Sequence, residues 1–255
     1  MLELINVSRG FGGVQALSGV SLSVPPQRIV GLIGPNGAGK TTLINNVSGL
    51  DHPNSGQILF DGQPIEKEPS HRITGLGIAR TYQNIRLFGE MTVRQNLLVG
   101  QHGLGRANIL EAVFFSPRYR REERQYRARA EELLERFGLV SVAGMAAGNL
   151  PYGDQRRLEL ARALATEPKV LLLDEPTAGM NPTETKALGE HIQDLRNDGL
   201  SILVIEHDMS LIHQVCDEIY VLNFGQIIAH GTSDEIRTDP VVIEAYLGRD
   251  DDGAA

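Results

Sequence analysis

Apolar and polar residues alternate near the start of the chain, whereas continuous apolar runs appear further on. The alternation covers residues 2–7 and 20–24 and predicts half-buried strands of an antiparallel sheet. The continuous runs lie within residues 169–175 and 201–208, each of which ends in charged or polar residues, and predict strands buried on both faces, as parallel strands are. Residues 183–196 are expected to form a crossover helix between these runs, so the three segments predict a β-α-β unit.

A helical pattern occupies the middle of the chain, from about residue 92 to residue 165. Its clearest apolar face recurs at helical spacing, at Tyr126, Ala130, Leu133, Leu134 and Phe137. Short strands are predicted before it, at residues 56–62 and 78–83, and Asp61-Gly62 suits a tight turn. We therefore expect a helical subdomain that is inserted before the sheet resumes.

Residues 34–42 have the spacing Gly-x-x-x-x-Gly-Lys-Thr, between a predicted strand at 28–33 and a predicted helix at 41–47. Glycines let the backbone wrap tightly and aim N–H groups inward, and the helix start adds partial positive charge. This P-loop therefore predicts phosphate binding, with Lys40 on the β- and γ-phosphates and the Thr41 hydroxyl on Mg²⁺. The residues expected to bind a nucleotide here are Gly34, Asn36, Gly37, Ala38, Gly39, Lys40, Thr41 and Thr42.

Polar side chains stand at the ends of the predicted strands, on the same side as the P-loop. Ligands of open α/β sheets bind at this edge. Asp174 can hold Mg²⁺, Glu175 can polarise a water molecule, and His207 can donate to a γ-phosphate. Gln83, at the border with the helical stretch, is placed to sense both Mg²⁺ and the γ-phosphate. We assign Glu175, His207 and Gln83 as catalytic residues, and Thr41, Gln83 and Asp174 as residues for the metal.

The expected fold class is α/β, with a P-loop NTPase core that has a mostly parallel sheet. An antiparallel β part precedes it, and a helical subdomain is inserted. We expect a single domain over residues 1–248. Residues 1–90 and 166–248 would form the RecA-like core with its N-terminal β part, and residues 91–165 the helical subdomain. Residues 249–255 are expected to be a disordered tail.

Composition removes several classes of protein. The net charge of −8 and the absence of Trp disfavour nucleic acid as a partner. Cys216 is the one cysteine, so no disulfide can form within the chain, and its apolar surroundings predict a small buried residue. No signal peptide and no apolar run near 18 residues is apparent, so we expect no membrane-spanning segment.

Two stretches allow two interpretations each. Phe11 lies between glycines ahead of the P-loop, where its ring could stack on adenine or simply be half exposed in a turn. Residues 117–127 are rich in Arg and follow Phe114 and Phe115. They could contact a membrane surface or a membrane subunit, or form a solvated helix in which Glu pairs with Arg, and we favour the solvated helix.

With these motifs in order, the chain resembles the ATP-binding subunits of ABC transporters over nearly its whole length. Phe11 matches the adenine-stacking aromatic residue, Gln83 the Q-loop and His207 the switch histidine. The Walker A, signature, Walker B and D-loop motifs match residues 34–42, 150–155, 170–175 and 178–181.

The resemblance implies two ATPase subunits that close head to tail on two ATP molecules. The signature of one subunit then completes the ATP site of the other in trans. The signature residues are Leu150, Pro151, Tyr152, Gly153 and Asp154.

More narrowly, the chain is similar to the branched-chain amino-acid uptake group. The similar stretches are residues 80–88, 152–159, 178–182 and 239–248. Within that group it is closer to the longer of the two paired ATPase subunits. The resemblance implies ATP and Mg²⁺ as cofactors and a second ATP-binding subunit, of the same or, as we favour, a different sequence. It also implies two membrane-spanning permease subunits, an external substrate-binding protein, no nucleic acid, and a peripheral position on the cytoplasmic face of the inner membrane.

The chain departs from the common family pattern at two motifs. Pro151 and Tyr152 replace the usual Ser-Gly of the signature, and Asn181 replaces the usual D-loop Asp. We expect Pro151 at the first position of the following helix, where proline is well suited. Other hypotheses are an importer of a related small solute, a soluble ABC ATPase of repair or translation, and a lone P-loop enzyme such as a kinase.

Overall fold

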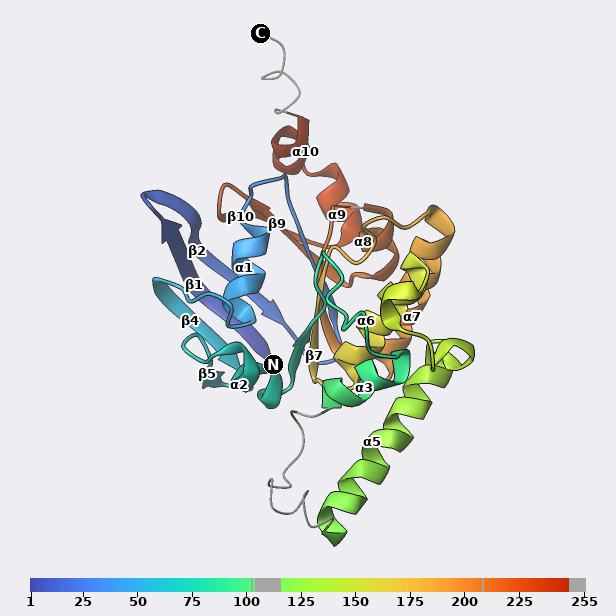
Figure 1. Cartoon of the computed structure of the whole chain (residues 1–255). Helices are drawn as coiled ribbons and strands as arrows, with labels where there is room; N and C mark the ends of the chain where they lie inside the picture. The colour runs from blue at the N-terminus through green and yellow to red at the C-terminus, as the bar shows by residue number, and fades with distance from the viewer. Residues whose placement is uncertain (102, 104–115, 208, 248–255) are drawn as a thin grey trace.

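The computed structural model describes residues 1–101, 103, 116–207 and 209–247. An antiparallel sheet packs beside a larger, mostly parallel sheet, and helices cover the far face of the larger one (Figure 1). The antiparallel sheet has the strand order β2-β1-β4-β5. Its strands are β1 (Leu2–Phe11), β2 (Val14–Val24), β4 (Ser55–Phe60) and β5 (Gln63–Pro64). The strands predicted at residues 2–7 and 20–24 are confirmed and are longer than the alternating pattern indicated. The strand predicted at residues 56–62 is confirmed as β4.

The larger sheet has the strand order β10-β9-β3-β8-β7-β6. Its strands are β3 (Ile29–Ile33), β6 (Ile78–Arg80), β7 (Val170–Asp174), β8 (Ser201–Ile205), β9 (Glu218–Asn223) and β10 (Gln226–Gly231). All neighbouring pairs are parallel except β9 and β10, which form a hairpin. Helix α7 (Pro182–Asn197) connects β7 to β8, which confirms the predicted β-α-β unit.

Apolar side chains on the two faces of the larger sheet enter two separate cores. Val30 and Leu32 of β3 pack with the antiparallel sheet and with α1 (Lys40–Val47), the helix after the P-loop. Ile29 and Ile33 pack instead against the helices on the other face. This division follows from the strand geometry, because successive side chains of a strand point to opposite faces. A continuous apolar run such as residues 29–33 is therefore needed wherever both faces are covered.

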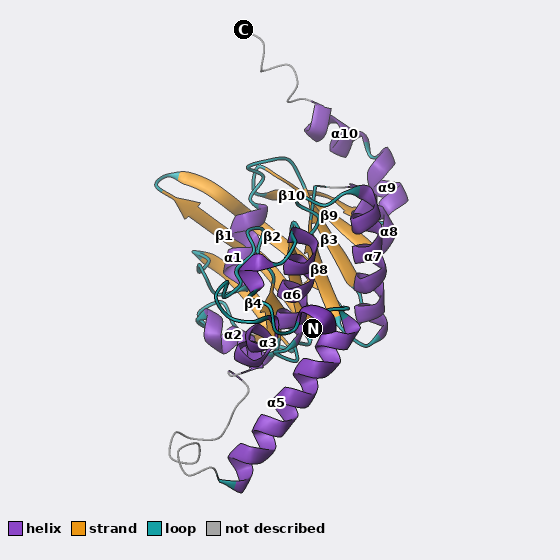
Figure 2. Cartoon of the chain, turned by 45° about the vertical axis from the view of Figure 1, so that its right-hand side comes forward, coloured by secondary structure: helices purple, strands orange, loops and turns teal. Residues whose placement is uncertain are grey.

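The helical part of the chain contains α3 (Val93–Gln101), α5 (Pro117–Arg136) and α6 (Tyr152–Leu164). Helix α3 contacts both others, and α5 extends away from the body of the molecule (Figure 2). The predicted apolar face is buried at Ala130, Leu133, Leu134 and Phe137, and partly buried at Tyr126. The subdomain limits at residues 91 and 165 stay a prediction.

The arginine-rich stretch lies on α5. Glu122 and Glu123 pair there with Arg118 at 3.5 Å and Arg127 at 3.3 Å, one helical turn away in each case. Such pairing supports the solvated helix that we favoured. Phe114 and Phe115 lie outside the described residues, as does the predicted tail at 249–255.

Shorter elements complete the description. They are α2 (Ser70–Leu76), α8 (Met209–Val215), α9 (Ser233–Thr238), α10 (Pro240–Leu247) and two 3-10 turns at Val140–Val142 and Ala147–Asn149. None of the helices within the described ranges combines the length and apolar character needed to cross a bilayer. Cys216 packs against the core, and burial raises the pKa of its thiol well above the usual range. The side chain is partly buried, so it packs beside the core that we predicted for it and not fully inside it.

Candidate nucleotide-binding site

The P-loop connects β3 to α1 and has a backbone that only glycine can adopt at two places. Gly34 has φ 153°, and a Cβ there would lie 2.0 Å from the carbonyl oxygen of Leu222. Gly39 has φ 110°, and a Cβ there would lie 2.5 Å from the carbonyl oxygen of Ala16. The spacing of the motif therefore reflects close approach of neighbouring backbone as well as phosphate binding.

Lys40 lies under this loop with its ammonium group turned inward. Its Nζ donates to the carbonyl oxygens of Gly34 at 2.6 Å and Pro35 at 3.0 Å, and the side chain is buried. Asn36 and Gly37 at the tip of the loop are exposed, and so is Thr41 at the start of α1. The loop thus presents backbone and hydroxyl groups to solvent, with a cation directly beneath.

Asp174 ends β7 and is buried, as expected of a residue that follows a continuous apolar strand. Its Oδ2 accepts from Arg80, the last residue of the neighbouring strand β6, at 2.8 Å. The strand predicted at residues 78–83 therefore ends at Arg80, and Gln83 stands three residues into the following loop.

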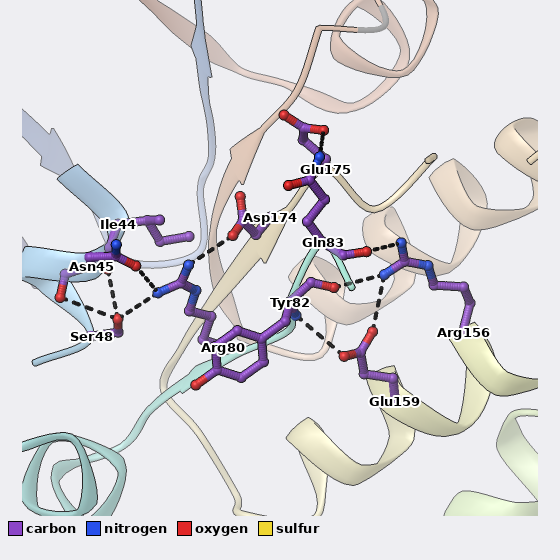
Figure 3. Close-up of polar contacts among 10 residues, drawn as sticks. All are labelled: Ile44, Asn45, Ser48, Arg80, Tyr82, Gln83, Arg156, Glu159, Asp174 and Glu175. Carbon is purple, nitrogen blue, oxygen red and sulfur yellow. Dashed lines mark hydrogen bonds and ion pairs between the residues drawn. The ribbon is translucent and has the colours of Figure 1, made fainter. Parts of the chain in front are cut away.

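Gln83 nevertheless reaches the end of β7. Its Nε2 donates to Oε2 of Glu175 over 2.6 Å (Figure 3). Glu175 has φ 47°, a left-handed conformation that costs a non-glycine residue about 1–3 kcal/mol. Its backbone N–H donates to the carbonyl oxygen of Ile205 at 2.8 Å, which binds the strained residue to the end of β8.

His207 stands on the other side of Glu175, with its Nδ1 3.9 Å from Oε2. The buried carboxylate of Glu206 anchors this segment. It accepts from the backbone N–H of His207 at 2.9 Å and from the backbone N–H of Thr177 at 2.8 Å. Glu206 thereby joins the loop after β7 to the end of β8, a role that the sequence analysis missed.

Two charged residues of α6 clamp the loop that carries Gln83. Arg156 donates to the carbonyl oxygens of Tyr82 at 2.8 Å and Gln83 at 2.5 Å, and pairs with Glu159 at 3.1 Å. Glu159 accepts from the backbone N–H of Tyr82 at 3.3 Å. Burial raises the pKa of Glu159, and the charge of Arg156 partly offsets the rise. The sequence analysis missed both, although Arg and Glu three residues apart on a helix are a recognisable signal.

The signature residues begin α6, and Pro151 is its N-cap residue, with φ −53° and ψ 150°. The predicted first helical position was therefore wrong by one residue, because this extended ψ lies outside the helical range. Tyr152 occupies the first position. Its hydroxyl donates to the carbonyl oxygen of Ala178 in the D-loop at 2.7 Å, and a Cβ at Gly179 would lie 3.1 Å from its ring. Asp154 pairs with Arg157.

Asn181, which replaces the usual D-loop Asp, is the N-cap residue of α7. Its side chain accepts from the backbone N–H groups of Thr183 and Glu184, both at 3.0 Å. Glu184 in turn accepts from the backbone N–H of Asn181, completing a capping box.

Phe11 ends β1 and is half exposed, with the guanidinium of Arg9 4.5 Å from its ring centroid. Both interpretations of Phe11 fit this position.

Comparisons with known proteins place the chain in a class. A family model described as ABC transporter matches residues 17–178. The ADP conformation of an ATP-binding cassette of an ABC transporter has a TM-score of 0.85 with 34% identity, covering 98% of this chain and 99% of that one. A dimeric bacterial ABC transporter cassette has a TM-score of 0.78 with 25% identity, covering 91% and 99%.

The chain belongs to the ABC transporter family, as an ATP-binding and ATP-hydrolysing cassette. This excludes the lone P-loop kinase. Within the family it is similar to the high-affinity branched-chain amino acid transport ATP-binding protein LivG of Escherichia coli K12. The two are 48% identical over 249 residues, which cover 97% of this chain and 98% of LivG. A second family model, described as branched-chain amino acid ATP-binding cassette transporter, matches residues 226–252.

Proposed function

We propose that this chain is the ATPase subunit that drives an importer of branched-chain or other hydrophobic amino acids. The observation that carries this proposal is the similarity to LivG over nearly the full length of both chains. The C-terminal match at residues 226–252 points to the same group of cassettes. This similarity favours transport over a role in repair or translation.

ATP binds with its phosphates in the P-loop in this proposal. Lys40 exchanges the two carbonyl oxygens that it now contacts for oxygens of the β- and γ-phosphates, which are charged and therefore stronger acceptors. The exposed ring of Phe11 stacks on the adenine. Thr42 and the N–H groups between Gly34 and Gly39 complete the phosphate contacts.

Mg²⁺ fits the residues that remain. Thr41, Asp174 and Gln83 offer oxygen ligands, which Mg²⁺ prefers. Within the described residues, no group of three or more His, Cys, Asp or Glu side chains is arranged to hold a metal. A cation held by a few protein oxygens and completed by substrate phosphates is the usual mode for Mg²⁺ in nucleotide sites. When bound, it neutralises charge that develops on the phosphates.

Glu175 acts as the general base in the proposed hydrolysis. It accepts a proton from the attacking water, while Gln83 and His207 stand on either side of its carboxylate. The hydrogen bond from Gln83 orients the carboxylate, and His207 donates to the γ-phosphate. Because Arg156 of α6 holds the Gln83 backbone, movement of the helical part would displace Gln83 from Glu175.

The proposed assembly has a second ATP-binding subunit, two membrane-spanning permease subunits and an external substrate-binding protein. The signature residues 150–154 complete the site of the second subunit, which we infer to have a different sequence. Similarity to a dimeric cassette supports the pairing. The chain then lies peripherally on the cytoplasmic face of the inner membrane.

Copurification from detergent-extracted membranes tests the class. We expect membrane-spanning partners and a second cassette to copurify with the chain. Proteoliposomes of that complex should hydrolyse ATP faster when the external binding protein carries leucine, isoleucine or valine than when it carries aspartate or no ligand. Copurification of ribosomes or nucleic acid without membrane proteins would overturn the proposal, and stimulation by another solute alone would reassign the cargo.

A further inference from the structure

Arg80 is a buried cation that joins three elements around the Walker B carboxylate. Its side chain is 7% exposed, and that of Asp174 is 10% exposed. One terminal nitrogen donates to Oδ2 of Asp174 at 2.8 Å. The other donates to Oδ1 of Asn45 and Oγ of Ser48, both at 2.8 Å, near the end of α1 (Figure 3).

The shape of this contact requires arginine. A guanidinium presents donors in a rigid fork, so one group can bond to β7 and α1 at the same time, whereas an ammonium group is a compact point charge. The Tyr82 ring lies against the guanidinium, with its centroid 4.8 Å from the central carbon. The Nε of Arg80 is buried without a hydrogen-bond partner, so the fork is oriented by its two terminal nitrogens.

The contact also connects α1 and β7, which carry two of the three proposed metal ligands, Thr41 and Asp174. Asn45 lies four residues after Thr41 on α1, so the two share one face of that helix. Asp174 ends β7. A bridge from Asn45 to Asp174 therefore limits how far the Thr41 hydroxyl and the carboxylate can move apart. With Oδ2 bonded to Arg80, Oδ1 remains as the carboxylate oxygen for the cation.

We propose that Arg80 is a positioning residue for the Mg²⁺ site: it spaces Asp174 relative to the P-loop helix and thereby sets the affinity for Mg²⁺ in the nucleotide complex. This rests on the proposed nucleotide function. Arg80 acts through Asp174 and Asn45 and touches neither nucleotide nor metal. The positive charge of Arg80 repels Mg²⁺, so a test must keep that charge constant and change only the shape of the donor group.

Arg80→Lys does this, and calorimetry measures the outcome without turnover. A non-hydrolysable ATP analogue is titrated into the full chain with EDTA and again over a series of Mg²⁺ concentrations. We expect the Mg²⁺ concentration for half-maximal enhancement of binding to rise at least threefold, with analogue affinity in EDTA unchanged. Asn45→Ala removes the α1 end of the bridge and should also raise this Mg²⁺ concentration. The double variant should raise it by less than the two single shifts combined.

Arg196→Lys is the matched control. Arg196 lies on α7 and also pairs with a carboxylate, that of Asp217 at 3.3 Å, but neither residue belongs to the proposed nucleotide site. It should leave the Mg²⁺ dependence unchanged. An unchanged or lower Mg²⁺ requirement in Arg80→Lys overturns the inference, even if melting temperature falls, and so does an equal loss of binding in EDTA. A wild-type chain that binds no analogue would instead contradict the proposed function.

Discussion

The side-chain amide of Gln83 donates a 2.6 Å hydrogen bond to the carboxylate of Glu175, although the two residues are 92 positions apart. The backbone carbonyl of the same Gln83 accepts from Arg156 at the start of α6. Gln83 thus connects the proposed base with the helix that carries the signature. A displacement of α6 would therefore move Gln83 relative to Glu175.

Glu175→Gln should abolish turnover while nucleotide binding persists. The amide carbonyl can still accept from Gln83, so the geometry survives, but an amide cannot take a proton from water. We expect ATPase activity below about a tenth of wild type in the assembled transporter, a loss of more than about 1.4 kcal/mol of transition-state stabilisation. An ATP-bound dimer should accumulate in size-exclusion chromatography. Activity above that level would remove Glu175 from the role of base.

Lys40→Ala should weaken nucleotide binding itself. The loss of one charge-assisted partner of a phosphate costs about 1.5–3 kcal/mol, equivalent to roughly ten- to a hundredfold in the dissociation constant. Calorimetric titration with ATP measures this. The variant also leaves the carbonyl oxygens of Gly34 and Pro35 without this donor, so a melting curve must show that it is folded. An unchanged dissociation constant in a folded variant would refute the P-loop assignment.

Arg156→Lys should reduce turnover more than affinity. Lysine keeps the charge beside Glu159 but cannot bond to that carboxylate and to both loop carbonyls with the same geometry. We expect kcat to fall about tenfold, the equivalent of one lost charge-assisted hydrogen bond, with little change in the ATP dissociation constant. Arg129→Lys, which alters an ion pair on α5, is the control and should behave as wild type. A variant with normal kcat would show that the clamp does not position Gln83.

Pro151→Ser tests whether the two ATP sites of the proposed pair are unequal. Proline at the N-cap offers no hydroxyl and no N–H, so the site completed by this signature lacks one contact worth about 1.5–3 kcal/mol. Serine should raise the ATPase rate or the nucleotide-dependent dimerisation of the assembled transporter.

Serine is also a better N-cap than proline, and an N-cap contributes about 0.5–2 kcal/mol to stability. The melting temperature of the isolated chain should therefore rise whatever happens at the partner's site. If only the melting temperature changes, Pro151 is a neutral variant and the two sites are equivalent.

Local pattern was sufficient for much of the fold. The apolar runs within residues 28–33, 169–175 and 201–208 favoured buried strands, because both faces of such a segment need apolar contacts, and they form β3, β7 and β8. Parallel strands end at the same edge, so Asp174, Glu175 and His207 were expected together from their positions alone. The Gly-Lys-Thr spacing identified the P-loop, since the loop depends on positive φ values that favour glycine, and α1 was expected directly after it.

The tertiary structure decided how these parts are connected. No pattern predicted the hairpin of β9 and β10, and nothing local indicated that Arg80 contacts Asp174 or that Glu206 joins two loops. These contacts join residues 29 to 94 positions apart. Periodicity shows which face of an element is buried, but the partner of a buried polar group depends on which elements become neighbours. That is set by how the chain packs as a whole, because a buried charge is stable only where packing brings a complementary group within hydrogen-bonding distance.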